Sequence, residues 1–275
     1  MRRGFAIALL VLLSACESGP GTNTRAVDPA SLPPMSGREQ ALLAAAEGAL
    51  RTGDRTSAIR DYQTAIAQSE GHIEAHISLA RVYLAQGEAG NARPILEKAV
   101  VWQPNHPQAN YLLGKILISE NRPAEAEEHF ARGLHIAPGN ADLLNGSGIA
   151  NDMLRNHARA QTLYLRAIAL TPPAETGVMR TNLAMSYLLD GAPKKAVVQL
   201  EAEVKKPGAS PVSKHNLALA YGMLGRNTEA KKLLGDEMTE ADRQLALERL
   251  KRYIATTPAA EPGPVIPGGP KGGRR

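Results

Sequence analysis

The sequence predicts an all-α protein, built as a right-handed superhelical solenoid of stacked helix pairs. Three observations predict this fold. Alanine recurs every 34 residues, a small residue precedes each of these alanines by twelve positions, and a bulky residue follows by four. A fixed period of this length is typical of repeat proteins, in which each unit buries its apolar face only by stacking on its neighbours. The alanines are Ala58, Ala92, Ala126 and Ala160, and the frame continues, after two extra residues, through Ala196 and Ala230.

Each unit contains two stretches with the period of an amphipathic helix. When each repeat is counted from 1, the first helix has apolar or small residues at positions 4, 7, 8 and 11, and the second has them at 20, 24 and 27. These spacings place the apolar residues on one face of a helix. Positions 8 and 20 are small, which allows two helix backbones to approach closely. The sequence therefore predicts six repeats, over residues 39–72, 73–106, 107–140, 141–174, 177–210 and 211–240.

The residue at position 15 separates the two helices of each repeat. Gly or Asn there suits the left-handed conformation that follows a helix C-terminus. Pro123 and Pro193 then fall in the first turn of a second helix, where a missing N–H costs little. The period, the small positions and the turn residues together resemble the tetratricopeptide repeat, a helix-turn-helix unit. Position 15 is occupied by Gly53, Gly87, Asn121, Arg155, Gly191 and Gly225.

Residues 1–15 have the pattern of a bacterial secretory signal. Arg2 and Arg3 precede an apolar run over residues 5–13, which is too short to span a bilayer as a mature helix. The run leads to Leu-Ser-Ala-Cys16, which resembles the lipobox of lipoproteins, a class whose cysteine is lipidated. Glu17 follows, and in enterobacterial lipoproteins a residue other than Asp there implies the outer membrane. We expect a lipid anchor at Cys16 on the periplasmic side; a chance cysteine after a signal peptide is the alternative.

Three further segments complete the predicted organisation. Residues 16–38 comprise the lipidated cysteine and a stretch rich in Pro, Gly, Ser and Thr, the composition of a flexible tether. Residues 240–256 form a helix with an apolar stripe at Leu247, Leu250 and Ile254, which we expect to cap the last repeat. Residues 257–275 are rich in Pro and Gly, so we expect this tail to be disordered.

Composition and spacing exclude several functions. The formal net charge is only +5 and is dispersed along the chain, which argues against a nucleic-acid partner. His72 and His76 are separated by Ile-Glu-Ala, a spacing that fits neither the zincin motif nor its inverted form. We find no catalytic constellation and expect no cofactor, no metal and no enzymatic activity. A hydrolase is retained as a third alternative, behind two binding functions.

A protein-binding surface is the better candidate for function. The first helix of each repeat should line the inner wall of the superhelix, mainly at positions 2, 5, 9 and 12. Apolar residues on a face that should be wet suggest a groove for a peptide or a helix. Packing between repeats is the alternative role for these side chains. The candidate partner-binding residues are Gln108, Tyr111, Lys115, Asn145, Asp152, Thr181, Asn182, Met185, His215 and Asn216.

Two stretches narrow the resemblance further. Residues 182–187, Asn-Leu-Ala-Met-Ser-Tyr, and residues 216–221, Asn-Leu-Ala-Leu-Ala-Tyr, resemble the last repeats of TadD-type lipoproteins of the tight-adherence (Flp) pilus assembly system. Residues 143–149 and the order of lipobox, tether, six repeats and cap are also similar. The resemblance implies a role in Flp pilus assembly, through localisation or assembly of the secretin pore, with the secretin or other Tad components as partners. The alternative is an adaptor lipoprotein that recruits a periplasmic protease or peptidoglycan hydrolase.

The fourth repeat departs from the pattern. Ser147 and Asn151 replace apolar residues at positions 7 and 11, and Gly146 and Gly148 lie in the same helix. Glycine weakens a helix by roughly 0.5–1 kcal/mol relative to alanine, and a buried amide needs a partner. We therefore expect residues 143–153 to form the least stable inner helix and to act as a hinge.

Overall fold

The structure is a computed structural model that describes residues 34–68, 71–234 and 239–256. Within these ranges the chain forms α-helices and one short 3-10 helix, with no β-strand, so the all-α prediction is confirmed. Cys16 and the predicted signal, most of the tether and the tail lie outside the described residues. The elements are α1 (Gly37–Arg51), α2 (Arg55–Gln68), α3 (Glu74–Ala85), α4 (Ala89–Trp102), α5 (Pro107–Ser119), α6 (Pro123–Ile136), α7 (Ala141–Met153), α8 (His157–Ala169), η2 (Pro173–Glu175), α9 (Gly177–Leu189), α10 (Pro193–Leu200), α11 (Pro211–Met223), α12 (Asn227–Leu234) and α13 (Glu240–Thr256).

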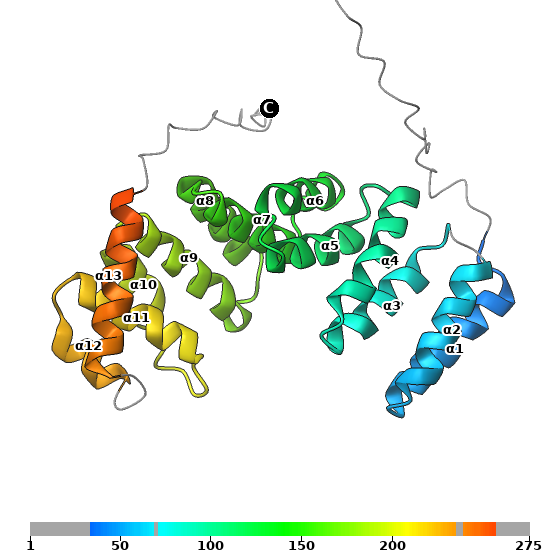
Figure 1. The fold of residues 1–275 in the computed structure, drawn as a ribbon, viewed down its shortest axis with the longest axis horizontal. Coiled ribbons are helices and arrows are strands. Elements are labelled where there is room, and N and C mark those ends of the chain that lie inside the picture. The colour runs from blue at the N-terminus through cyan, green and yellow to red at the C-terminus, as the bar shows by residue number, and fades with distance from the viewer. Residues whose placement is uncertain (1–33, 69–70, 235–238, 257–275) are drawn as a thin grey trace, which may run out of the picture.

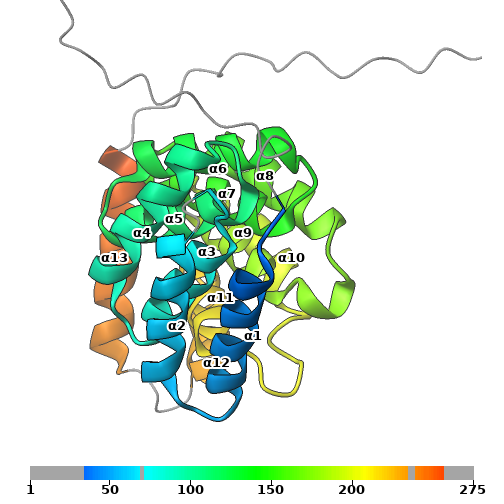
Figure 2. The ribbon, with the colours of Figure 1, turned by 90° about the vertical axis from the view of Figure 1, so that its right-hand side faces the viewer.

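The helices stack in sequence order and the stack curves into an arch (Figure 1). α6 and α8 lie on its outer side and α5 lies on its inner side (Figure 1). Figure 2 views the arch from the end that α1 and α2 form. The first helix of one repeat also contacts the first helix of the next, from α5 to α7, α7 to α9 and α9 to α11. The predicted solenoid is therefore confirmed, with η2 occupying the place of the two extra residues.

The recurring alanines lie where helices cross. Five of them, all except Ala230, have no exposed surface. The bulky residues four positions later are buried as well, because each lies one helical turn further along the same face. The period seen in the sequence is therefore the period of the core. The five alanines are Ala58, Ala92, Ala126, Ala160 and Ala196, and the bulky residues are Tyr62, Leu96, Phe130 and Tyr164.

Glycines in α5 and α7 make room for two aromatic rings. A Cβ on either Gly114 or Gly146 would lie 2.6 Å from Cε1 of Phe130, so this ring lies between the backbones of α5 and α7. A Cβ on Gly148 would lie 2.5 Å from Cε1 of Tyr164. Real Cβ contacts are essentially never this short, so a larger residue at any of the three positions would force the facing ring to move. The glycines of α7 are therefore sites of close packing.

This packing removes the reason for placing a hinge in α7. The hinge was expected because Gly146 and Gly148 weaken a helix and because the amide of Asn151 needs a partner when it is buried. In the structure the glycines are covered by rings, and the Asn151 side chain donates to the carbonyl oxygen of Ser147, with Nδ2 and O 2.8 Å apart. The Ser147 hydroxyl in turn donates to the Glu127 carboxylate. The polar residues of α7 thus have partners, and most of the helix is buried.

The C-terminal end of the arch departs most from the regular period. α10 and α12 have only 8 residues each, whereas the second helices of the earlier repeats have 13 or 14. α13 packs against α9 and α11. Leu247 of α13 is buried, and a Cβ on Gly222 would lie 3.5 Å from its side chain. The side chains of Leu250 and Ile254 lie outside what the structure describes.

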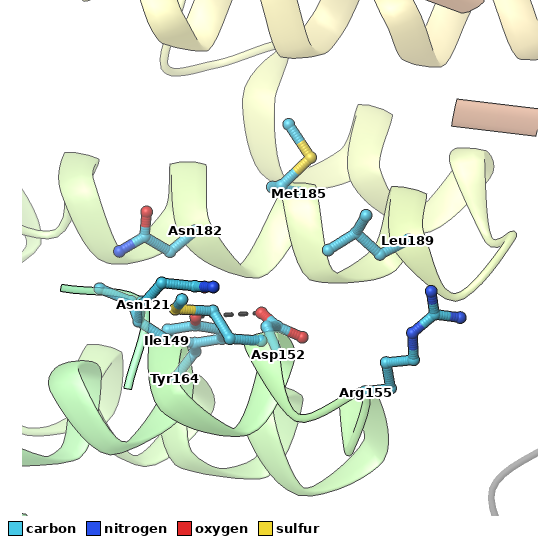
Figure 3. A pocket seen from close by; sticks show the side chains of 9 residues that line it. Asn121, Ile149, Asp152, Arg155, Tyr164, Asn182, Met185 and Leu189 are labelled. Carbon is cyan, nitrogen blue, oxygen red and sulfur yellow. Dashed lines mark hydrogen bonds between the residues drawn. The ribbon is translucent and has the colours of Figure 1, made fainter. Parts of the chain in front are cut away.

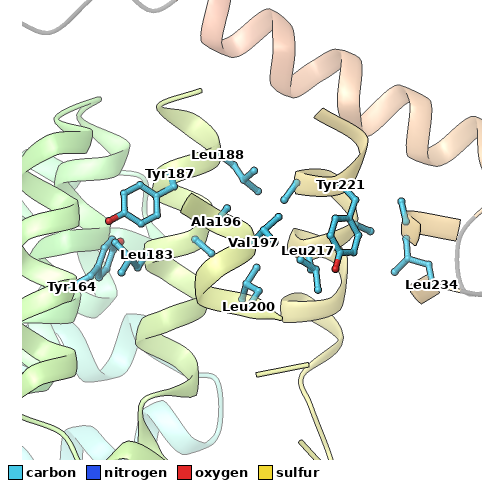
Figure 4. Close-up of a cluster of buried hydrophobic side chains, with 14 of the residues drawn as sticks. Tyr164, Leu183, Tyr187, Leu188, Ala196, Val197, Leu200, Leu217, Tyr221 and Leu234 are labelled. Atoms are coloured by element: carbon cyan, nitrogen blue, oxygen red, sulfur yellow. The ribbon is translucent and has the colours of Figure 1, made fainter. Parts of the chain in front are cut away.

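A buried apolar cluster fills the junctions from α8 to α12 (Figure 4). Tyr164 begins it, Leu183 and Leu188 of α9 continue it, and Leu234 of α12 ends it. All members are apolar or tyrosine, so this part of the core contributes through burial, at about 25 cal/mol per Å² of apolar surface. The cluster holds α9 firmly, and α9 forms one wall of the candidate site.

Candidate functional site

An open pocket of 480 Å³ lies between α7 and α9, near the middle of the arch (Figure 3). We call it the α7–α9 pocket. Its apolar lining comes from Ile149 and Met153 of α7 and from Met185 and Leu189 of α9. Its polar lining adds groups from two turns and from α8, so three consecutive repeats contribute to one site. The polar residues that line it are Asn121, Asp152, Arg155, Tyr164 and Asn182.

The floor of the pocket is a buried carboxylate with three partners. Asp152 Oδ1 lies 2.8 Å from Nδ1 of His157 and accepts a hydrogen bond from Ser186 Oγ at 2.7 Å. Its Oδ2 accepts from the Tyr164 hydroxyl at 3.0 Å. Burial, and then the negative charge of Asp152, raise the pKa of Tyr164 far above its ordinary value, so this hydroxyl remains a donor. The network joins α7 to α9 and to the turn and helix of α8.

A side-chain amide bond crosses from α7 to α9 at one end of the pocket. Asn182 Nδ2 donates to Asn145 Oδ1 at 3.0 Å. Both side chains are partly exposed. Because an amide has two donors and two acceptor positions, the pair keeps hydrogen-bonding capacity for another molecule. Asn145, Asn182 and Met185, all predicted from the sequence, are therefore brought together here.

The predicted residues of α5 form a separate group. Gln108 and Tyr111 are half-buried and Lys115 is exposed. The ammonium of Lys115 lies 5.4 Å from the centroid of the Tyr111 ring, within the range of a cation–π contact. The Tyr111 ring lies 6.5 Å from that of Phe130, tilted by 49°, so part of it belongs to the core. Burial, and then the charge of Asp142, raise the pKa of Tyr111.

Three predicted residues are buried and do not form an exposed surface. Thr181 is 7% exposed, and its hydroxyl lies 2.8 Å from that of Ser213 on α11. Asn216 is 4% exposed and Asp152 is 8% exposed. The sequence left open that such side chains pack between repeats, and this is the better description of the three residues. Of the three, only Asp152 also lines the α7–α9 pocket. His215 is half-buried, with an Nε2 that has no hydrogen-bond partner.

Sequence reasoning missed the two turn residues that line the pocket. Asn121 and Arg155 were read only as variants of the glycine at position 15. Their backbone φ angles are 58° and 64°, and they are the only residues other than glycine with positive φ among those the structure describes. The signal was present in the sequence, since a side chain replaces glycine at two of six equivalent turns.

The described residues contain no cluster of three metal-ligating side chains. Nδ1 of His72 lies 3.1 Å from the Glu39 carboxylate, and His76 is buried in α3. None of the described helices is both long and apolar enough to cross a bilayer. The arrangement offers hydrogen bonds, apolar contacts and charge, which are the elements of binding.

The stacked helix pairs and the lined inner side define a repeat solenoid of the protein-binding class. Family models described as tetratricopeptide repeat match residues 49–116 and 107–140. Residues 49–140 of the chain are therefore tetratricopeptide repeats, and the helix pairs beyond them continue the same solenoid. Proteins of this class bind protein partners and are typically not enzymes.

Similar proteins extend the comparison. The rat (Rattus norvegicus) DnaJ homolog subfamily C member 3 is 25% identical over 189 residues, which span 64% of this chain and only 38% of that protein. The crystal structure of PilW, described as a widely conserved type IV pilus biogenesis factor, is 18% identical with a TM-score of 0.64, over 77% of this chain and 99% of that one. The Pseudomonas aeruginosa pilF structure is 16% identical with a TM-score of 0.58, over 78% and 92%. At these identities the two structures show a shared fold.

Proposed function

We propose that this protein is an outer-membrane lipoprotein that faces the periplasm and assists the assembly of Flp-type pili as a non-enzymatic scaffold. The observation that carries the proposal is a repeat solenoid whose last repeats, at residues 182–187 and 216–221, resemble those of TadD-type lipoproteins. Two solved structures of similar fold are those of PilW, a type IV pilus biogenesis factor, and of Pseudomonas aeruginosa pilF, which is consistent with this role. The lipobox ending at Cys16 supports the anchor.

The proposed partners are the secretin pore or other components of the same assembly system. They would bind the inner side of the arch, where Lys115 is exposed, Tyr111 is partly exposed and the α7–α9 pocket opens. Aromatic residues dominate the binding energy of many interfaces, and a charge nearby steers the partner. A solenoid suits this task because its curved inner wall presents several repeats to one partner.

The anchor is tested by Cys16→Ser. Because Cys16 is the only cysteine in the chain, this variant has no thiol to receive lipid. We expect the protein to leave the membrane fraction and pilus assembly to fall. Retention of Cys16→Ser in the outer membrane would contradict the lipoprotein proposal.

The binding surface is tested by Tyr111→Ala combined with Lys115→Ala. We expect loss of pilus assembly with lipidation and helicity unchanged, and a thermal unfolding curve separates loss of binding from loss of fold. Glu127 is unsuitable as the control because its carboxylate bonds to Ser147 and Arg159. Glu128→Ala is the better control, since Glu128 is exposed on the second helix of the same repeat. Equal pilus assembly by the double variant and the control would place the binding surface elsewhere.

A further inference from the structure

The turn between α4 and α5 is held by a network that includes two histidines. Nδ1 of His106 accepts a hydrogen bond from the backbone N–H of Ala109 at 3.4 Å and so caps the N-terminus of α5. The Asn110 side chain, which has no exposed surface, donates from Nδ2 to the carbonyl oxygens of Pro104 at 2.8 Å and of His106 at 3.0 Å. Its Oδ1 lies 2.9 Å from Nδ1 of His129 on α6. The network thus joins repeat 2 to repeat 3.

The partners of each histidine fix which ring nitrogen carries a proton. A backbone N–H can only donate, so Nδ1 of His106 is unprotonated in this cap. Both hydrogens of the Asn110 amide go to carbonyl oxygens, so its Oδ1 accepts and Nδ1 of His129 donates. Acid therefore affects the two rings differently. A second proton on His106 goes to Nδ1 and removes the cap, whereas His129 keeps its donor in either state.

The equivalent turn of the next repeat has a cap that does not titrate. Asn140, which lies 34 residues after His106, caps α7, with its Oδ1 3.0 Å from the backbone nitrogen of Leu143. An amide side chain does not ionise, so this cap is the same in acid and at neutral pH. The chain therefore contains one cap that depends on pH and one that does not, at the same repeat position.

Burial favours the neutral form of both histidines. It lowers the pKa of His106, and the negative charge of Glu74 on α3 acts against this shift. Burial also lowers the pKa of His129, and the charge of Arg132 on the same helix adds to the effect. Three carboxylates that face His129 act against the shift, and each of them pairs with an arginine. They are Glu97 of α4 and Glu125 and Glu128 of α6.

The direction of the pH effect follows from these lowered pKa values. In the unfolded chain a histidine takes up a proton near pH 6.5, whereas in the folded protein the same step requires a lower pH. The stability that the neutral rings contribute is complete above about pH 6.5 and is lost as the pH falls from there to the lowered pKa. A charged His106 would also lie at the positive end of the α5 dipole, where a cation is disfavoured.

We propose that the α4–α5 turn is an acid-sensitive joint of the arch, which opens locally when His106 is protonated. Loss of the cap frees the first turn of α5, and the contact between repeats 2 and 3 loosens at this point. Gln108 lies in this turn, so the inner side of the arch changes at α5 when the pH falls. The inference goes beyond the proposed function and does not depend on it.

The test is amide hydrogen exchange of the purified full chain, followed by NMR at about pH 7.5 and about pH 5 and corrected for the intrinsic pH dependence of exchange. An N-cap stabilises a helix roughly fivefold, so we expect the protection of the Ala109 and Asn110 amides to fall about fivefold or more in acid. The equivalent amides of α7, those of Leu143 and Leu144, should keep their protection because Asn140 does not titrate. Unchanged protection of Ala109 and Asn110 in acid would overturn the proposal.

The matched variant is His106→Asn, which gives α5 the cap that α7 already has. We expect this variant to fold and to keep the protection of the Ala109 amide in acid within a factor of about two. The control is His135→Asn, which replaces an exposed histidine of α6 and should respond to acid as the unmodified chain does. A full loss of protection in acid by His106→Asn would mean that another group titrates, and the proposal would fail.

A second variant, His129→Gln, separates the two histidines of the network. A glutamine amide can still donate to the Asn110 side chain, so we expect the loss of protection in acid to remain. If His129→Gln abolished this loss while His106→Asn retained it, the joint would respond to His129, and the role assigned to His106 would be wrong.

Discussion

The first helices of repeats 3 and 4, α5 and α7, occupy equivalent places and differ in chemistry. At positions 7 and 11, α5 has Leu113 and Leu117, which are 2% and 3% exposed. At the same positions α7 has Ser147 and Asn151, each 2% exposed. The two positions are thus equally buried in both helices, but the side chains differ: α5 buries apolar groups and α7 buries polar groups. Apolar surface needs only contact, whereas each buried polar group needs a placed partner.

The hydrogen-bond partners of α7 come from three of its neighbouring helices, α6, α8 and α9. Glu127 of α6 accepts from Ser147, and Asp152 accepts from Tyr164 of α8 and Ser186 of α9. Such bonds have direction, so they fix the relative position of the helices more narrowly than apolar contact does. The comparison teaches that directed hydrogen bonds hold α7 to its neighbours at positions 7 and 11, where α5 uses apolar packing.

The largest loss of stability is expected from Asp152→Ala, which removes the acceptor at the centre of the hydrogen bonds of α7. The change leaves the buried Tyr164 and Ser186 hydroxyls and the His157 ring without their shared acceptor. Removing one member of a buried charged network costs about 3–5 kcal/mol of unfolding free energy. Chemical denaturation measures the change, and Asp142→Ala, an exposed acid in the same helix, is the control. A loss no greater than that of the control would mean that the network does not hold the junction.

A smaller loss is expected from Gly148→Ala. The new methyl group would lie 2.5 Å from the Tyr164 ring, which the floor network holds in place. Overpacking of this kind costs about 1–3 kcal/mol. Gly90→Ala in α4, where a Cβ would meet nothing within 4 Å, should be neutral or slightly stabilising. Thermal unfolding measures both variants. Equal midpoint temperatures for Gly148→Ala and Gly90→Ala would contradict close packing at α7.

A gain in stability is expected from Arg155→Gly. The left-handed conformation costs an L-residue roughly 1–2 kcal/mol, and glycine avoids this cost. Glycine also gives the unfolded chain more conformational freedom, which lowers stability by about 0.4–1 kcal/mol. The net increase in unfolding free energy is about 0.5–1 kcal/mol. Gly225→Ala, at φ 75° with open space around it, is the reverse change and should lose stability. Destabilisation by Arg155→Gly would show that the arginine side chain stabilises the turn.

The smallest difference is expected in hydrogen exchange between α7 and α5. Because the polar groups of α7 are paired and its glycines are covered, residues 143–153 should open at free energies no lower than those of α5. Native-state exchange followed by mass spectrometry or NMR measures this. Earlier opening of α7 alone would restore the hinge that the sequence suggested.

The fold was predictable because its information is local and repeated. The period of 34 residues, the alanine at position 20 and the glycine turns each recur several times, so chance agreement is small. The chemistry of repeat 4 was not predictable in the same way. Asp152 meets His157, Tyr164 and Ser186, which lie 5, 12 and 34 residues away, and no spacing rule joins these residue types.

The candidate site was predictable only in part. The rule of helix positions included Met185, which lines the α7–α9 pocket, and Asn145, which bonds to Asn182 of the lining; Asn182 itself was named from the resemblance of residues 182–187. The same rule put Thr181 on the inner wall, and the resemblance of residues 216–221 added Asn216, although both side chains are buried. Position numbers describe one helix, whereas exposure depends on how closely the next repeat approaches, and that distance is set by side chains elsewhere in the core.

The ring of Phe130 bears on how freely repeats can be exchanged within this chain. It occupies a slot formed by Gly114 of its own repeat and Gly146 of the next. If repeat 4 were deleted, the residue brought to the place of Gly146 would be Asn182, which has a Cβ where the ring needs none. Recombination at this junction must therefore transfer the ring and both glycines together. The unit that can be copied or removed here is longer than one sequence repeat and straddles its boundary.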